Sequence, residues 1–421
     1  MKHRQTTWVL GAALASALPF ATAHAEAPTM SVETVMSGLE NPWDMAFLDD
    51  GTMFFTEKCK GLSVRMPSGD VNPLLGMTGT SGYPATAVDL FCEGQAGMMG
   101  VAVDPDFAEN NTIYVYSTSS LTAPGTNRLM RLVLTDDMAG VASRVDIVDD
   151  IPYKPKASDH PFGGPGAHNG GRVRFDADGH LWLTTGDTHN GVVPQSPTMM
   201  GGKVLRMDRD GNAAVGNNPP AGFDPRVFTY GHRNVQGIAF RPSDGAAVAA
   251  EHGPWHSDEI TVLVNGGNAG WDPRPNMAGR GDCPDGYCGY MPNQMDGMDP
   301  DARSKFMPMT DTASYPNAMP PAWNNNGLSQ GTGSAAFLSG AQWGEWDGRM
   351  AVGIMGIGFG DTPSGVRIDV VDIAADDASV NDVTAMDLPM EPARFRSIVL
   401  GPDGSLYAAV DLGDIYKLSP N

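Results

Sequence analysis

The stretch Phe175-Asp-Ala-Asp-Gly-His-Leu-Trp-Leu183 places an Asp-Gly turn between two apolar runs. Asp-Gly in this setting is a strong signal for a β-hairpin, because both residues accept the backbone angles of a tight turn. The more general unit, an apolar residue, a short turn rich in Asp, Gly or Asn and then an apolar strand, occurs five more times, over residues 47–55, 103–116, 240–248, 346–352 and 400–408. Most of these segments are separated by about fifty to seventy residues, the length of a four-stranded blade with its loops. The sequence therefore predicts an all-β fold, a six-bladed β-propeller of four-stranded antiparallel blades.

The rest of the sequence shows no pattern that predicts a second domain. Amphipathic helical periodicity is nearly absent, and 52 Gly with 33 Pro suit a turn-rich all-β chain. We expect one propeller domain over residues 26–421, in which the strand at 413–418 closes a blade that begins near Val32. A Gly-, Pro-, Asn-, Asp- and Met-rich segment, about residues 270–334, breaks the hairpin spacing. We expect it to be a long loop insertion, either a loosely attached decoration or part of a binding site.

The first 25 residues have the features of a secretory signal peptide. Lys2 and Arg4 precede an apolar run, and Ala23-His24-Ala25 is a small-residue cleavage pattern. A membrane anchor is the alternative, but the apolar run is short and rich in Ala and Gly. We expect cleavage after Ala25 and a periplasmic or secreted protein that is not embedded in the membrane.

Export affects the expected charge and the expected state of the cysteines. Without the signal peptide, 25 basic residues face 49 acidic ones, a net charge of −24, so neither nucleic acid nor an anionic membrane is an expected partner. Disulfides are the default in an exported chain. Cys283 and Cys288 could close a small loop, which leaves Cys59 to pair with Cys92. A zinc site is the alternative, although the spacings match no usual ligand pattern.

Polar residues that directly follow apolar runs are candidates for a site in the central channel of a propeller. Four acidic residues recur at this position, namely Glu57, Asp187, Glu251 and Asp411. For each of them an ordinary role in capping a turn is the alternative. His168 lies among glycines just before the strand at 173–175, where it could meet a ligand and take a proton near neutral pH. An ordinary loop histidine is the alternative for His168.

The segment from Tyr230 to Pro254 combines two kinds of binding group. Arg233 and Asn234 near its start can donate to an anion, and the carbonyl groups of Gly253 and Pro254 at its end suit a hard cation. A site that uses both would bind a negatively charged ligand together with a metal.

Arg394 and Arg396 form a second cationic feature. They are two residues apart at the start of a strand, so their side chains face the same side. Two such arginines repel each other unless an anion lies between them, and the planar guanidinium suits a carboxylate. A pair of surface salt bridges is the alternative.

Several motifs, in this order, resemble those of the soluble, periplasmic PQQ-dependent sugar dehydrogenases, the glucose/sorbosone or aldose dehydrogenase family. They are Gly94-Gln-Ala-Gly-Met-Met-Gly-Val101, His168-Asn-Gly-Gly-Arg172, Thr185-Gly-Asp187, Gly202-Lys-Val-Leu-Arg-Met-Asp208, Gly231-His-Arg-Asn234, Glu251-His-Gly-Pro254 and Arg394-Phe-Arg396. The resemblance extends from Leu39 to Tyr407 and covers most of the mature chain. It implies oxidation of an aldose sugar or another alcohol, with transfer of the electrons to an acceptor such as a cytochrome or a quinone.

The resemblance also implies roles for individual residues. His168 would remove the hydroxyl proton of the substrate while hydride passes to the quinone, and Asp187 would support the site. The cofactor would be held by Gln95, Arg233, Asn234, Arg394 and Arg396. Calcium would bind the main-chain oxygens of Gly253 and Pro254 and make the quinone carbonyl more electrophilic.

Three features depart from the family pattern. Gly356 stands where the family usually has a lysine against the quinone. Asp258-Glu-Ile-Thr261 and Asn268-Ala-Gly-Trp271 replace the family's Asp-Glu-Leu-Asn and Asn-Tyr-Gly-Trp, which places a second calcium site near Glu259 in question. The segment at about 270–334 has no counterpart in the pattern.

Two other functions are compatible with a six-bladed propeller. One is a calcium-dependent lactonase that would bind its metal through Glu57, Asn234, Asp187 and Asp411. The other is a cofactor-free binding protein, in which the missing lysine marks a redox site that has decayed.

Overall fold

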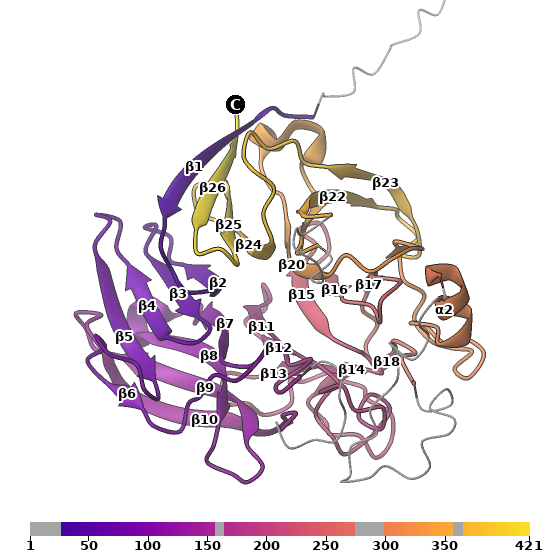
Figure 1. Cartoon of the computed structure of the whole chain (residues 1–421), viewed down its shortest axis with the longest axis horizontal. Helices are drawn as coiled ribbons and strands as arrows, with labels where there is room; N and C mark the ends of the chain where they lie inside the picture. The colour runs from indigo at the N-terminus through magenta and orange to yellow at the C-terminus, as the bar shows by residue number, and fades with distance from the viewer. Residues whose placement is uncertain (1–26, 156–163, 274–298, 357–364) are drawn as a thin grey trace, which may run out of the picture.

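The structure, a computed structural model, describes residues 27–155, 164–273, 299–356 and 365–421. In these residues the chain forms six small, mainly antiparallel sheets arranged in a ring (Figure 1). The prediction of an all-β six-bladed propeller is confirmed. The expected signal peptide, residues 1–25, and the expected Cys283–Cys288 pair lie outside the described residues.

We number the blades in chain order, with the strands of each blade as follows. Blade 1 contains β2 (Pro42–Phe47), β3 (Met53–Glu57), β4 (Gly61–Arg65), β5 (Val71–Met77) and β6 (Thr86–Ala87), and blade 2 contains β7 (Met98–Val103), β8 (Thr112–Ser119), β9 (Thr126–Leu134) and β10 (Val141–Pro152). Blade 3 contains β11 (Gly170–Phe175), β12 (Leu181–Thr185), β13 (Lys203–Met207), β14 (Val227–Tyr230) and β18 (Gly267–Asn268). Blade 4 contains β15 (Val235–Phe240), β16 (Ala247–Glu251), β17 (Glu259–Val262) and β19 (Trp323–Asn324). Blade 5 contains β20 (Thr332–Phe337), β21 (Met350–Ile354), β22 (Arg367–Ile373) and β23 (Val380–Ala385).

Blade 6 is built from both ends of the chain. It contains β24 (Phe395–Leu400), β25 (Leu406–Val410), β26 (Ile415–Pro420) and β1 (Met30–Met36). Strand β1 pairs antiparallel with β26, and Val32 lies opposite Leu418, as the sequence predicted. This pairing of the two ends of the chain closes the ring through backbone hydrogen bonds within blade 6.

Five of the six predicted hairpins join the first two strands of a blade as expected. The segment 346–352 differs, because Trp346 ends a 3-10 helix, η4 (Ala341–Trp346), and the partner of β21 is β20. Two blades also carry a fifth strand that the prediction lacked, and β6 and β18 pair in parallel with their neighbours. Within the expected insertion, the described residues form helix α2 (Pro300–Phe306), β19 and the start of β20, so part of that segment builds blades 4 and 5.

The first strand of every blade faces the axis of the propeller. Strands β2, β7, β11, β15, β20 and β24 each contact the next, and β24 contacts β2, which closes the inner ring. Apolar side chains from facing blades pack between the sheets, as Phe54, Leu62 and Val64 of blade 1 do against Val101 and Ile113 of blade 2. A short helix, α1 (Phe107–Asn110), lies in the turn between β7 and β8 and buries Phe107.

A buried ion pair crosses the centre of the ring. Asp44 of β2 lies 2.5 Å from Arg172 and 2.8 Å from Arg174, both of β11, and accepts a 2.8 Å hydrogen bond from Ser397 of β24. Burial opposes the ionisation of Asp44, but the two guanidinium groups outweigh it and lower its pKa below the usual value. The guanidinium of Arg172 also lies 4.4 Å over the ring of Trp43. These contacts tie blades 1, 3 and 6 together, so Arg172 of the His168–Arg172 motif serves the core.

The described residues include a disulfide between Cys59 and Cys92, as expected from the sequence. It joins the turn between β3 and β4 in blade 1 to the loop before β7. No helix in these residues has the length and apolar character that crossing a membrane requires.

Candidate active site

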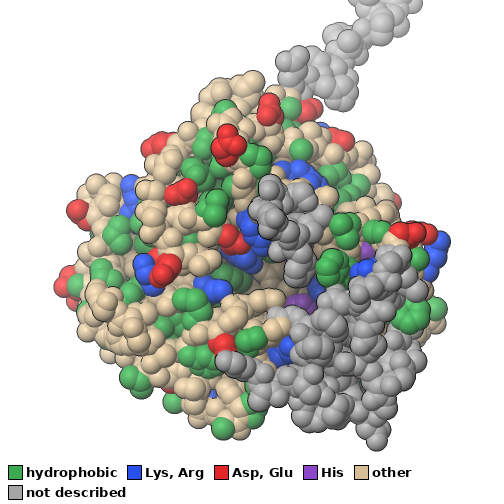
Figure 2. Space-filling view, in the orientation of Figure 1, with side chains coloured by type: hydrophobic (Ala, Val, Ile, Leu, Met, Phe, Trp, Pro, Cys, Tyr) green, Lys and Arg blue, Asp and Glu red, His purple; other side chains and the backbone are tan. Residues whose placement is uncertain are grey.

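A cavity of about 410 Å³ opens at one end of the central channel. Lys and Arg side chains gather around the hollow at the middle of this face (Figure 2). Seven of the nine sequence-predicted site residues line the cavity, namely Gln95, His168, Arg233, Asn234, Gly253, Arg394 and Arg396. The other two, Asp187 and Pro254, are buried behind its wall.

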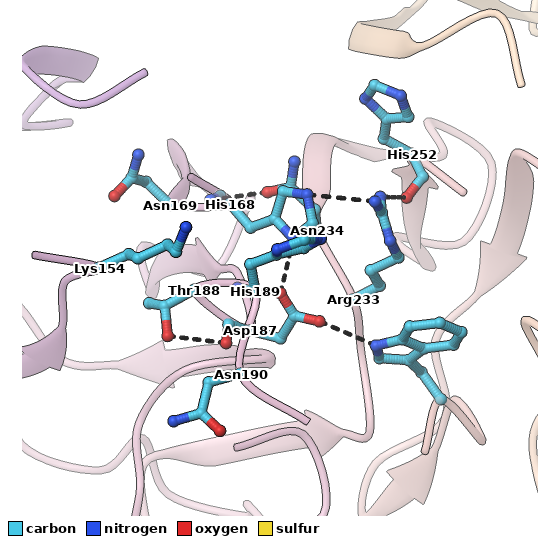
Figure 3. Close-up of polar contacts among 12 residues, drawn as sticks. Lys154, His168, Asn169, Asp187, Thr188, His189, Asn190, Arg233, Asn234 and His252 are labelled. Carbon is cyan, nitrogen blue, oxygen red and sulfur yellow. Dashed lines mark hydrogen bonds and ion pairs between the residues drawn. The ribbon is translucent and has the colours of Figure 1, made fainter. Parts of the chain in front are cut away.

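His168 lies just before β11 and is held on both ring nitrogens. Its Nδ1 is 2.7 Å from Oδ1 of the fully buried Asp187, and its Nε2 is 3.1 Å from Nη2 of Arg233 (Figure 3). A guanidinium can only donate, so Nε2 accepts and the ring proton resides on Nδ1, from which it is donated to Asp187. The surroundings therefore present His168 as a neutral imidazole whose acceptor nitrogen belongs to the cavity wall.

Asp187 is itself fixed by the loop that follows β12 and by a tryptophan. Its Oδ1 accepts the backbone N–H of His189 at 2.8 Å, and its Oδ2 accepts the indole N–H of Trp271 at 2.9 Å. The ring of His189 meets that of His168 edge to face, with 4.8 Å between centroids. His189 also lines the cavity, and the sequence reasoning did not single it out.

The segment before β15 is anchored by Glu251 at the end of β16. Glu251 accepts the backbone N–H groups of Arg233 and Asn234 and lies 2.7 Å from Nδ1 of His232. The side-chain oxygen of Asn234 then accepts the backbone N–H of Gly170 at 3.0 Å, which ties β15 to β11. Nη1 of Arg233 donates to the carbonyl of His252 at 2.6 Å. Glu251 therefore orients the binding residues and does not line the cavity itself.

Arg394 and Arg396 do have an anion between them, and it belongs to the protein. Asp411 accepts from Nε of Arg394 at 2.9 Å and from Nε and Nη2 of Arg396, each at 2.8 Å. Burial opposes the charge on Asp411, but the two arginines lower its pKa to about 2. Arg394 also donates to the carbonyls of Met355, at 2.6 Å, and Gly356, at 3.3 Å. The sequence argument required an anion here but did not identify Asp411 as that anion.

The predicted calcium ligands lie in a tight turn between β16 and β17. A side chain at Gly253 would place its Cβ 2.0 Å from the carbonyl oxygen of His256 and 2.6 Å from that of Ser257, so the turn requires glycine. The carbonyl of Gly253 accepts the N–H of Trp255 at 3.1 Å, and its own N–H donates to Asp258 at 2.8 Å. The turn therefore gathers several main-chain oxygens next to the cavity.

Asp258 organises this turn, a role that sequence reasoning missed. Its carboxylate also accepts the hydroxyl of Ser329 at 2.6 Å and the backbone N–H groups of Gln330, at 2.7 Å, and Gly331, at 3.0 Å. The neighbouring Glu259 is buried with fewer donors, and burial and the charge of Glu251 raise its pKa to about 8.

Gln95 lines the cavity, whereas Glu57 lies outside the cavity lining. The side-chain oxygen of Gln95 is 3.5 Å from the backbone nitrogen of His168, at the limit of a hydrogen bond. Glu57 accepts the backbone N–H of Glu40 at 2.6 Å and lies 3.7 Å from Lys60, outside the cavity lining. Of the four residues that a lactonase would use, Glu57 and Asp187 do not line the cavity and Asp411 is held by two arginines. This arrangement does not favour a side-chain calcium site of that kind.

The family assignment rests on the whole propeller as well as on this cavity. A family model for glucose/sorbosone dehydrogenase matches residues 39–417. The chain belongs to the glucose/sorbosone dehydrogenase family. This membership confirms the recognition made from the motifs and the expectation of an oxidoreductase.

Individual relatives match different shares of the chain. The chain is 27% identical to aldose sugar dehydrogenase YliI of Escherichia coli (strain K12), over 99% of each chain. It is 28% identical to quinoprotein glucose dehydrogenase B of Acinetobacter calcoaceticus, over 62% of this chain and 55% of that protein. The structure of the PQQ-bound aldose sugar dehydrogenase of Streptomyces coelicolor superposes with a TM-score of 0.65 at 22% identity, over 94% of this chain and all of the other. At this level of identity, the similarity to the Streptomyces coelicolor structure shows a shared fold only.

Proposed function

We propose that this member of the glucose/sorbosone dehydrogenase family is a periplasmic quinoprotein that oxidises an aldose sugar or another alcohol by hydride transfer to PQQ, with Ca²⁺ bound beside the cofactor. Its electrons would pass to an acceptor such as a cytochrome or a quinone. The observation that carries the proposal is the meeting, in one cavity, of an oriented neutral histidine and a wall of cationic side chains.

The chemistry of the cavity fits a polycarboxylate cofactor. About 410 Å³ is within the usual range for pockets that enclose small organic molecules. Burial, and after it the charges of Arg233, Arg396 and Arg394, lower the pKa of His252 to about 3, so this imidazole adds no charge to the cationic wall that the arginines form. The side-chain oxygen of Gln236, which lines the cavity and is buried, has no hydrogen-bond partner among the described residues. A ligand with carboxylates and a polar ring N–H would satisfy both features.

When bound, PQQ supplies the acceptor of two electrons, and the protein supplies orientation and a base. His168 would accept the proton of the substrate hydroxyl at Nε2, while its Nδ1–H remains on Asp187. The carboxylate of Asp187, 2.7 Å away, would stabilise the imidazolium that results. Arg233 now donates to Nε2, so this guanidinium must turn away when a hydroxyl takes its place.

The cationic wall and the tight turn would have separate binding tasks. Arg394 and Arg396 keep outer N–H groups beyond those that Asp411 engages, and these would meet carboxylates of PQQ. Asn234 and Gln95 would contact its carbonyl oxygens. The main-chain oxygens of Gly253 and Pro254 would hold Ca²⁺, since hard cations prefer oxygen ligands.

The proposal is tested by turnover of the reconstituted protein. The chain from Glu26 onwards is incubated with PQQ and Ca²⁺, and dye reduction is followed with aldoses, other alcohols and a buffer blank. His168→Asn should abolish most of the activity, while His180→Asn, a matched change at a surface turn, should leave it unchanged. Absence of dye reduction with every sugar and alcohol, or lactone hydrolysis without PQQ, would overturn the proposal.

A further inference from the structure

Lys58 is a cation of the cavity that neither the motifs nor the strand-end pattern identified. It follows β3 directly and lines the cavity on the side of blade 1. Its Nζ donates to the carbonyl of Gly94 at 2.8 Å, the one hydrogen bond of this ammonium group among the described residues. An ammonium group has three donors, so two remain for a ligand in the cavity.

The charges around Lys58 do not balance. Lys58 interacts electrostatically with Arg396 and Asp411, so that Lys58, Arg394 and Arg396 share one carboxylate, that of Asp411. Burial lowers the pKa of Lys58, Arg396 lowers it further, and Asp411 raises it in part. A chain with 49 acidic and 27 basic residues has many carboxylates, yet this wall of the cavity has an excess of positive charge. Such an excess favours a bound ligand with more than one negative charge.

The position of Lys58 is fixed from both sides. Cys59, the next residue, is bonded to Cys92, which lies two residues before Gly94. The backbone carbonyl of Lys58 also accepts the N–H of Met98 at 2.9 Å. The loops that carry Lys58 and its hydrogen-bond acceptor are therefore covalently joined. This arrangement holds the ammonium group at the cavity wall before any ligand arrives, which reduces the entropic cost of binding.

We propose that Lys58 is a carboxylate-binding residue of the cavity and contributes to the affinity for PQQ together with Arg394 and Arg396. The proposal rests on the proposed function, because it names a further contact to the same cofactor. It also assigns the Cys59–Cys92 disulfide a task, namely to fix Lys58 and the loop at Gly94–Gln95 relative to each other.

The test compares equilibrium binding of PQQ to four proteins in the presence of Ca²⁺. The proteins are the wild type, Lys58→Gln, Lys58→Arg and, as a matched control, Lys60→Gln. Lys60 is two residues away, but it lies 3.5 Å from Glu40, is 41% exposed and does not line the cavity. Binding is followed by the absorbance of the quinone, and the fold of each variant by its thermal unfolding midpoint.

Lys58→Gln should raise the Kd for PQQ about tenfold or more, because a charge-assisted hydrogen bond is lost. Lys58→Arg should retain most of the affinity, and Lys60→Gln should stay within about twofold of the wild type. Lys58→Gln should also weaken the dependence of Kd on salt concentration, which a purely structural change would not do. Wild-type binding with an unchanged Kd in Lys58→Gln would overturn this inference and leave the proposed function intact. Absence of PQQ binding by the wild type would overturn both.

Discussion

Replacing Asp187 by Asn separates the catalytic role of this carboxylate from its structural role. Asp187 accepts from three N–H groups, those of His168, His189 and Trp271. The asparagine oxygen can keep the two donors on the side of His168, but its NH₂ group then faces the indole N–H of Trp271. Two buried donors in contact cost about 1–3 kcal/mol. Asp187→Asn should therefore lower the free energy of unfolding by about that amount.

The catalytic loss has a different origin. The asparagine keeps His168 in the same tautomer but removes the negative charge that would stabilise the imidazolium. A hydrogen bond to a charged partner contributes about 1.5–3 kcal/mol, so kcat should fall about ten- to a hundredfold. The Kd for PQQ should change little, because Asp187 does not line the cavity.

Trp271→Phe provides the control, since it removes the donor that the asparagine amide would oppose. In the double variant Asp187→Asn/Trp271→Phe, the free energy of unfolding should fall by less than the sum of the two single changes. The kcat of the double variant should stay as low as that of Asp187→Asn. Stability is measured by urea unfolding, and kcat by dye reduction with PQQ and Ca²⁺ at saturation. A value of kcat that returns to the wild-type level together with stability would refute the reasoning, because Asp187 would then act only through the fold.

Three further predictions concern stability and the metal. Because the pKa of Glu259 is raised to about 8, its protonated form is favoured in the folded state, and stability should fall as the pH rises from about 4.5 through 8. Glu259→Gln should flatten that dependence in urea unfolding at pH 5, 7 and 9, and an unchanged slope would contradict the assignment. Gly253→Ala would place a Cβ 2.0 Å from the carbonyl of His256, so it should raise the Ca²⁺ concentration needed for reconstitution with PQQ, whereas an unaltered Ca²⁺ requirement would remove Gly253 from the metal site. Asp411→Asn removes the carboxylate between Arg394 and Arg396, so the thermal unfolding midpoint should fall, and added citrate should restore part of it. A midpoint that does not respond to citrate would show that no unbalanced charge remains.

The propeller could be predicted from the sequence because most blades begin with a hairpin whose short turn, rich in Asp, Gly or Asn, is a local signal. The fifth strands could not be predicted, since β6 and β18 are only two residues long, and β18 pairs with β14, which lies several strands earlier in the chain. The hairpin of blade 5 was displaced because the apolar Trp346, which looked like a strand residue, is buried in a 3-10 helix. Two-residue strands and buried helical turns leave no periodicity to detect.

The site residues that belong to recognisable motifs could be predicted from the sequence, whereas contacts between single residues of different blades could not. His168, Arg233 and Asn234 came from recognisable motifs, and the structure brings them together. The pairing of Asp411 with Arg394 and Arg396 was open, because residues 15 and 17 positions apart could equally face different partners. A lone lysine after a strand, such as Lys58, carries no signal of its own. Its neighbour Cys59 was the one hint, since the disulfide fixes that loop at the cavity.

The most direct test of the proposed function is an equilibrium titration of residues 26–421 with PQQ, with and without Ca²⁺, followed by the absorbance of the bound quinone. The arrangement of the cavity predicts saturable binding of one PQQ per chain, tighter with Ca²⁺ and weakened about a hundredfold or more when Arg394 and Arg396 are both replaced by Gln. No saturable binding, or binding that the double replacement leaves unchanged, would contradict the assignment of this cavity to the cofactor.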